Sequence, residues 1–154
     1  CFLGWNVYQR NAISVINPEA VESLETILSS KNITCDFKLN NIEVKKYMKK
    51  ININNENNIE EKFLPLSSIE KGTEYTGRNR ELISLPSIIV KFIRETKVKD
   101  VNIKSISLGY YPEINQIDTG VLYGEATPAW LICLDNGSEY IYNAYLGYVA
   151  FLKA

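Results

Sequence analysis

The segment AWLICLDNGSEYIYNAY, residues 129–145, decides the fold of this chain. Its first part, Ala129 to Leu134, is apolar at every position, which is typical of a central strand that is buried on both faces. The Asn-Gly pair at 136–137 accepts the positive φ angles that a two-residue hairpin turn requires. After the turn, Glu139 to Ala144 alternates, with both of its tyrosines on one side. The segment therefore predicts an antiparallel hairpin within a sheet.

Two helices and further strands are expected on either side of this hairpin. Asn17-Pro18 is typical of a helix start, which predicts a helix over residues 18–30. A second helix begins at Ser84, and its apolar residues recur at helical spacing. The polar run 67–79 predicts a connector between two halves. The other strand-like segments are residues 33–39, 42–53, 62–66, 101–111, 120–123 and 148–152.

One helix followed by several antiparallel strands occurs twice along the chain. We therefore expect an α+β fold made of two helix-plus-antiparallel-sheet units, residues 11–80 and 81–154. The length of 154 residues and the 45% hydrophobic content allow one compact domain or two small fused units.

Charge and composition limit the classes of function that this chain is expected to have. The formal net charge is −1, from 17 basic and 18 acidic residues, so no global field draws nucleic acid to the chain. The chain has no histidine, which removes Ser-His-Asp and Cys-His catalysis and His-ligated metals. We expect no enzyme activity, no catalytic residues, no metal, no cofactor and no nucleic-acid partner.

Other chemistry-bearing residues favour a structural role. Cys35 and Cys133 could pair in space, or each could be a small buried hydrophobe. The carboxylate pairs Glu22/Glu25 and Glu60/Glu61 are predicted to be solvated, which makes them poor general acids. The basic cluster 45–50 fits an anionic partner or, alternatively, a strand whose exposed lysines discourage edge pairing.

The first ten residues are apolar and aromatic at their start and polar at their end. Residues 1–10 resemble the outgoing end of a membrane anchor or a juxtamembrane segment, with Trp5 and Tyr8 at the level of the lipid headgroups. A strand or helix packed on the domain, or a lipidated Cys1, are the alternatives.

Tyrosine is concentrated in the second half of the chain. Seven of the ten tyrosines lie between Tyr110 and Tyr148. This clustering fits either a binding face or ordinary cross-strand packing. The candidate contact residues for a partner or a membrane are Trp5, Tyr8, Tyr110, Tyr111, Tyr140 and Tyr142.

The C-terminal third carries a recognisable series of motifs. LGYYP at 108–112, PAWLI at 128–132, DNG at 135–137 and YIYNAYLG at 140–147 resemble the terminal segment of the YycI/YycH family. Members of this family are membrane-anchored extracytoplasmic regulators of the WalK sensor kinase in Gram-positive bacteria. Similar spacing also occurs in PepSY-like domains.

The resemblance implies a specific role. It implies an N-terminal transmembrane helix that ends near Tyr8, a domain on the extracytoplasmic side of the cell membrane, and contacts with a sensor histidine kinase and a YycH-like regulator, with a dimer left open. The family is regulatory and supplies no catalytic residues. The alternative is a PepSY-like envelope binding or peptidase-inhibiting module, and an enzyme acting on the cell wall is a third reading.

Overall fold

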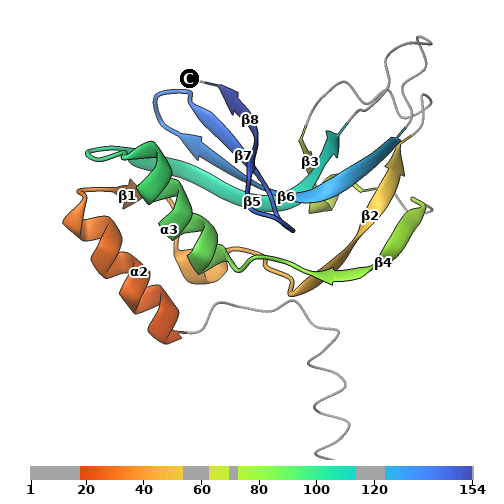
Figure 1. The fold of residues 1–154 in the computed structure, drawn as a ribbon. Coiled ribbons are helices and arrows are strands. Elements are labelled where there is room, and N and C mark those ends of the chain that lie inside the picture. The colour runs from red at the N-terminus through yellow and green to blue at the C-terminus, as the bar shows by residue number, and fades with distance from the viewer. Residues whose placement is uncertain (1–17, 54–62, 70–72, 114–123, 154) are drawn as a thin grey trace, which may run out of the picture.

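The computed structural model describes residues 18–53, 63–69, 73–113 and 124–153. Over these residues the fold is α+β, with two helices and one eight-stranded sheet (Figure 1). The elements in chain order are α2 (Pro18–Ser30), β1 (Thr34–Cys35), the 3₁₀ turn η1 (Leu39–Asn41), β2 (Tyr47–Ile53), β3 (Leu64–Pro65), the 3₁₀ turn η3 (Leu66–Ser68), β4 (Tyr75–Glu81), α3 (Leu85–Thr96), β5 (Asn102–Glu113), β6 (Gly124–Leu134), β7 (Glu139–Asn143) and β8 (Val149–Lys153).

The long antiparallel pair β5–β6 forms the centre of the sheet. The predicted hairpin between β6 and β7 is confirmed, but its turn has three residues, Asp135 to Gly137, since the Leu134 N–H donates to the Ser138 carbonyl at 2.9 Å. Gly137 is the one residue of the turn with a positive φ, of 92°, and its N–H donates to the Leu134 carbonyl at 3.1 Å. Only glycine adopts this backbone angle readily, which explains why the turn lies at Asn-Gly.

The outer edge of β6 has two different partners, so the sheet divides into two arms (Figure 1). Its start, near Ala126, pairs with β2, which continues to β4. Its end, from Ala129 onward, pairs with β7, which continues to β8. Pro128 lies where the partner changes, and its carbonyl accepts from the Ala144 N–H. A residue other than proline would point its N–H to this same edge, at the place where the partner strand changes. Proline therefore removes no hydrogen bond from the sheet here.

Both predicted helices are confirmed. The range of α2 is the expected one, and α3 begins after Ser84, whose side-chain oxygen accepts from the Ser87 N–H. Helix α3 ends at Thr96, and Lys97, the residue that caps it, has a left-handed φ of 53°. The two helices lie side by side (Figure 1). The face that α3 buries consists of Leu85, Ile88, Ile89, Phe92 and Ile93.

Four predicted elements, three strands and one connector, differ from the structure. The expected strand over 33–39 pairs only at β1, because the chain then enters the turn η1. The strand expected over 42–53 begins at Tyr47, and the one over 62–66 is limited to β3. The prediction of a connector over 67–79 is wrong in its second part, because β4 begins at Tyr75. An edge strand with mostly exposed side chains carries no apolar alternation, so the sequence did not reveal it.

Strands from both halves of the sequence share the one sheet, since β2 pairs with β6. The division of the chain at residue 80 into two units, and their PepSY-like character, stay predictions. The expected strand over 120–123 lies outside the described residues.

Candidate interaction surface

The structure separates the six candidate contact residues into three groups. Trp5 and Tyr8 lie outside the described residues. Tyr110 and Tyr142 are 3% and 0% exposed, so their rings belong to the core and are not available to a partner in this fold. Tyr111 and Tyr140 are half-buried. The tyrosine set is therefore mainly cross-strand packing, which was one of the two readings of the sequence.

The half-buried tyrosines contact neighbouring rings. Tyr140 meets Phe92 of α3 edge-on, with ring centroids 5.0 Å apart and an interplanar angle of 71°. Helix α3 thus packs on the side of β7 that carries Tyr140. The ring centroids of Tyr111 and of Phe151, which is on β8, lie 6.1 Å apart. An edge-on pair such as Tyr140–Phe92 stabilises packing beyond the area that it buries, whereas the Tyr111 and Phe151 rings are tilted by 42°.

Burial governs the ionisation of the core tyrosines. Desolvation, with smaller contributions from Glu95 and Tyr140, raises the pKa of Tyr142 to about 12. Desolvation also raises the pKa of Tyr110, with smaller contributions from Tyr75 and Tyr145. Both phenols are therefore neutral at physiological pH.

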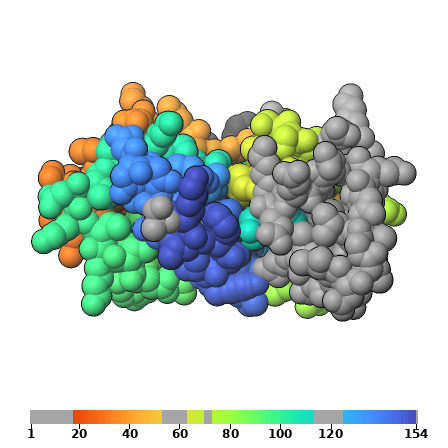
Figure 2. All heavy atoms as spheres, turned by 90° about the horizontal axis from the view of Figure 1, so that it is seen from above, coloured from red at the N-terminus to blue at the C-terminus, as the bar shows by residue number. Residues whose placement is uncertain are grey.

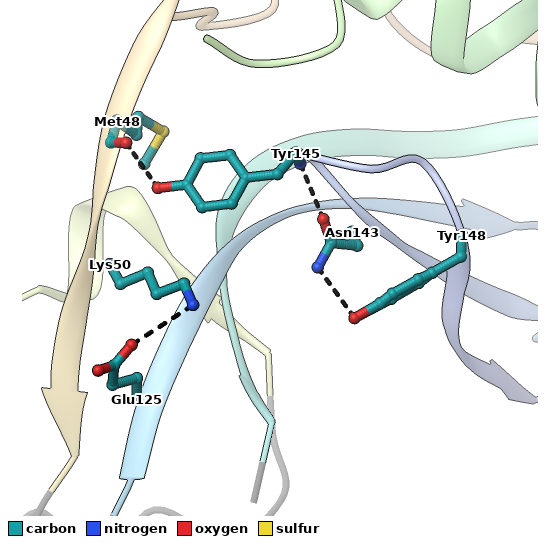
Figure 3. A network of polar contacts seen from close by, with 6 residues as sticks. All are labelled: Met48, Lys50, Glu125, Asn143, Tyr145 and Tyr148. Atoms are coloured by element: carbon teal, nitrogen blue, oxygen red, sulfur yellow. Dashed lines mark hydrogen bonds and ion pairs between the residues drawn. The ribbon is translucent and has the colours of Figure 1, made fainter. Parts of the chain in front are cut away.

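The turn between β7 and β8 is organised by Asn143, which is 4% exposed (Figure 3). Its side-chain oxygen accepts from the backbone N–H groups of Tyr145 and Leu146, at 2.8 and 2.9 Å. Its amide nitrogen donates to the Tyr148 hydroxyl at 3.1 Å. The turn closes at Gly147, which has a left-handed φ of 83°. The side chain of Asn143 thus fixes the point from which β8 starts.

Tyr145 ties this turn to the other arm of the sheet (Figure 3). Its hydroxyl donates to the Met48 carbonyl of β2 at 2.6 Å. The guanidinium of Arg80, on β4, lies 4.3 Å from the centre of the Tyr145 ring, a cation–π contact. Lower in the same view, Lys50 of β2 and Glu125 of β6 form an ion pair at 3.5 Å.

Two tyrosines of this region differ in a way that stability measurements can test. Tyr145→Phe removes the donor to the Met48 carbonyl, and we expect it to cost about 1 to 2 kcal/mol of unfolding free energy. The buried Tyr142 hydroxyl has no hydrogen-bond partner in the described part of the chain. Tyr142→Phe removes that unsatisfied group, so we expect unchanged or slightly higher stability.

Urea denaturation of both variants beside the parent chain measures the two effects. Each substitution removes one oxygen from a buried tyrosine, so each is the size control for the other. Equal losses of stability in the two variants would contradict the assigned bond between Tyr145 and Met48.

The C-terminal edge strand carries the main exposed apolar surface of this arm. Its members are exposed by 38% to 68%, and β8 pairs only with β7 among the described residues. We call this surface the β8 edge surface. Its residues are Leu146, Tyr148, Val149, Phe151 and Leu152. The sequence placed a strand here, but the candidate set omitted these residues. The sequence signal that could have identified these residues is a run of apolar residues without regular polar alternation.

The edge strand of the other arm is different. In β4 the side chains of Arg78, Arg80 and Glu81 are exposed. Charged side chains on an edge strand discourage pairing with another chain. The single charged residue of β8 is Lys153, at its end. Of these two edges, β8 has the side chains that favour a partner strand, and β7 is its one neighbour among the described strands.

The remaining candidates are isolated groups. Glu22 and Glu25 are exposed as expected, and Glu60 and Glu61 lie outside the described residues. In the basic cluster, the residues Lys45, Lys46 and Lys49 are exposed, while Met48 is buried. This is the pattern of a strand with solvated lysines.

Cys35 and Cys133 are free thiols, each half-buried. Desolvation raises the pKa of the Cys35 thiol to about 11, with smaller contributions from Asp36 and Glu25. A thiol with such a pKa is a weak nucleophile at neutral pH. Across the ranges that the structure describes, no three Cys, Asp or Glu side chains are grouped as metal ligands.

The described helices are also too short or too polar to cross a bilayer. Comparisons with protein-family models, with curated proteins and with solved structures gave no match.

Proposed function

We propose that this chain is a membrane-anchored, extracytoplasmic regulatory domain that modulates a two-component sensor histidine kinase through protein contacts. Its partners in this proposal are the kinase and a YycH-like regulator, and the domain carries out no chemistry. The proposal rests on the motifs within residues 105–150 that resemble the YycI/YycH family. These motifs fold into β5, β6, β7 and the turn that positions β8.

The β8 edge surface is the observation that carries the proposal. An open strand edge binds an extended segment by main-chain hydrogen bonds, and exposed side chains on both faces of the strand add specificity. Leu152 and Val149 are 57% and 43% exposed, so they offer apolar area that a partner would bury. The network around Asn143 fixes the strand beforehand, which reduces the entropic cost of binding.

The PepSY-like alternative would use the same surface for a different partner. A domain that holds an envelope ligand or restrains a peptidase also needs a rigid edge and no catalytic groups. The two proposals differ in what is bound at β8, so the identity of the bound protein distinguishes them.

A charge placed on β8 tests the proposal. Leu152→Lys adds a charged side chain to an exposed position, where it discourages strand addition but leaves the core intact. In the full-length protein, expressed in a Gram-positive host, we expect at least about a fivefold loss of the kinase recovered by crosslinking and co-purification from membranes. Tyr75→Lys is the matched control, because Tyr75 is 56% exposed on the other edge strand, β4.

Both variants should keep the melting temperature of the parent, since neither side chain is buried. Equal kinase recovery with Leu152→Lys and with the parent would remove the β8 edge surface from the interface. Recovery of a peptidase in place of the kinase would favour the PepSY-like alternative.

A further inference from the structure

A second surface, distant in sequence from β8, lies between the C-terminal halves of α2 and α3. These halves lie side by side (Figure 1) and enclose a hollow of about 500 Å³, which we call the helix groove. Its apolar lining consists of Ile27, Val90, Ile93 and Val98. Val90 is 36% exposed, although it lies next to the fully buried Ile89. The core of the domain therefore leaves part of its aliphatic surface open here.

Four cations line the same groove. They are Lys31, which follows α2, and Arg94, Lys97 and Lys99, which lie on or after α3. The ion pairs in the described parts of the chain are Lys50–Glu125 and Lys91–Glu95, so none of the four has an acidic partner there. Helix dipoles favour cations at C-terminal ends. They do not account for the open aliphatic surface between those cations.

The groove is held in shape by bonds between the two segments that follow the helices. The Asp100 N–H donates to the Lys31 carbonyl at 3.0 Å. The Asn32 amide donates to the Asp100 carboxylate at 2.8 Å, which ties the same two segments together a second time. Further along, the Thr34 hydroxyl donates to Asn102 at 2.7 Å. A groove fixed in this way does not have to form when a partner arrives.

We propose that the helix groove is a docking site for an acidic amphipathic helix of a protein partner. A helix packs naturally into the furrow between two others, and its apolar residues at spacings of three and four would cover the aliphatic lining. Flanking Asp and Glu side chains would reach the four cations. If the docked helix runs antiparallel to α2 and α3, its N-terminus lies beside the C-terminal ends of those two helices. Its acidic first turn and the positive end of its dipole then face the negative ends of theirs.

The shape of the site favours a helix over a membrane. A bilayer binds apolar side chains that protrude, whereas Ile93 is 6% exposed and lines a hollow. A recessed apolar surface needs a ligand that projects into it. From Val90 to the end of α3 at Thr96 the lining spans about 9 Å of helix, which matches between one and two turns of a docked helix.

A synthetic peptide tests this site in the full chain. The probe is a fluorescein-labelled helix of about 18 residues with leucine along one face and glutamate on the flanks. Binding is measured by fluorescence anisotropy, and we expect Arg94→Gln combined with Lys99→Gln to weaken it about tenfold. Lys45→Gln combined with Lys46→Gln is the matched control, which removes two exposed cations from the segment just before β2 and should change affinity by less than about twofold.

Three further measurements complete the test. Val90→Asn keeps every charge but makes the lining polar, so it should also weaken binding several-fold. A peptide of the same composition with its leucines scrambled should bind much more weakly. Vesicles of phosphatidylglycerol should not compete with the peptide for the groove.

The proposal fails if the designed peptide does not bind at concentrations up to about 1 mM. It also fails if the scrambled peptide binds equally well, or if the two double variants lose the same affinity, because the interaction would then be unspecific charge attraction. Competition by the vesicles would assign the groove to a lipid surface. All of these results are independent of the β8 edge surface.

Discussion

Trp130→Ala should lower the free energy of unfolding by about 3 to 5 kcal/mol, the largest effect of any single substitution considered for this chain. Trp130 is 1% exposed in the middle of β6, opposite Leu108 of β5 and Tyr142 of β7. Its indole N–H donates to the Ile83 carbonyl at 3.3 Å, in the segment just before α3. Truncation leaves a cavity at the junction of the sheet with α3 and removes the donor to that carbonyl.

Urea denaturation followed by circular dichroism measures this effect. Leu146→Ala is the control, because Leu146 is 68% exposed and its truncation should cost less than about 0.5 kcal/mol. A melting curve unchanged by Trp130→Ala would mean that the indole is exposed and available to a partner.

Gly109→Ala should cost about 2 to 3 kcal/mol, although it adds only one methyl group. A Cβ at this position would lie 2.2 Å from the Leu64 carbonyl oxygen and 2.7 Å from the ring of Phe63. The first of these is a backbone atom of β3, so it cannot move without breaking the pairing of β3 with β5. The close approach of β3 to the central pair therefore requires glycine here.

Gly77→Ala separates this steric effect from backbone strain. Gly77 has a φ of 71°, but a Cβ there would meet nothing within 4 Å. Its substitution should cost only about 1 kcal/mol, from the left-handed backbone angle alone. If Gly109→Ala is no more damaging than Gly77→Ala, then β3 does not lie against β5 as described.

The sequence predicted the elements whose signals are local. The Asn-Gly turn, the capping Ser84 and the periodic apolar residues of both helices identify α2, α3 and the β6–β7 hairpin, because each depends on neighbours within a few positions. Strand β4 was missed, because its side chains are mostly exposed and its strand conformation comes from pairing with β2. Pairing of distant segments leaves no periodic trace in an edge strand.

The candidate site was harder to predict for a related reason. Alternation shows that Tyr140 and Tyr142 share one face of β7, but it does not show what covers that face. Helix α3 packs there, through Phe92, and leaves Tyr142 wholly buried. The apolar residues of β8 are exposed because no described strand lies beyond them. Which surface is covered depends on the assembly of the whole sheet.

The bond from Tyr145 to Met48 has a mechanical consequence. It joins the turn before β8 to β2 directly, by a route that does not pass through the ladder of β6. Force applied to β8 would reach β2 through the Tyr145 phenol, and Arg80 beside its ring would be displaced with it. The same turn is also joined to the segment after β4, because the Ile83 N–H donates to the Ala144 carbonyl at 2.7 Å. The two arms of the sheet would then move together, with Tyr145 as a direct link between them.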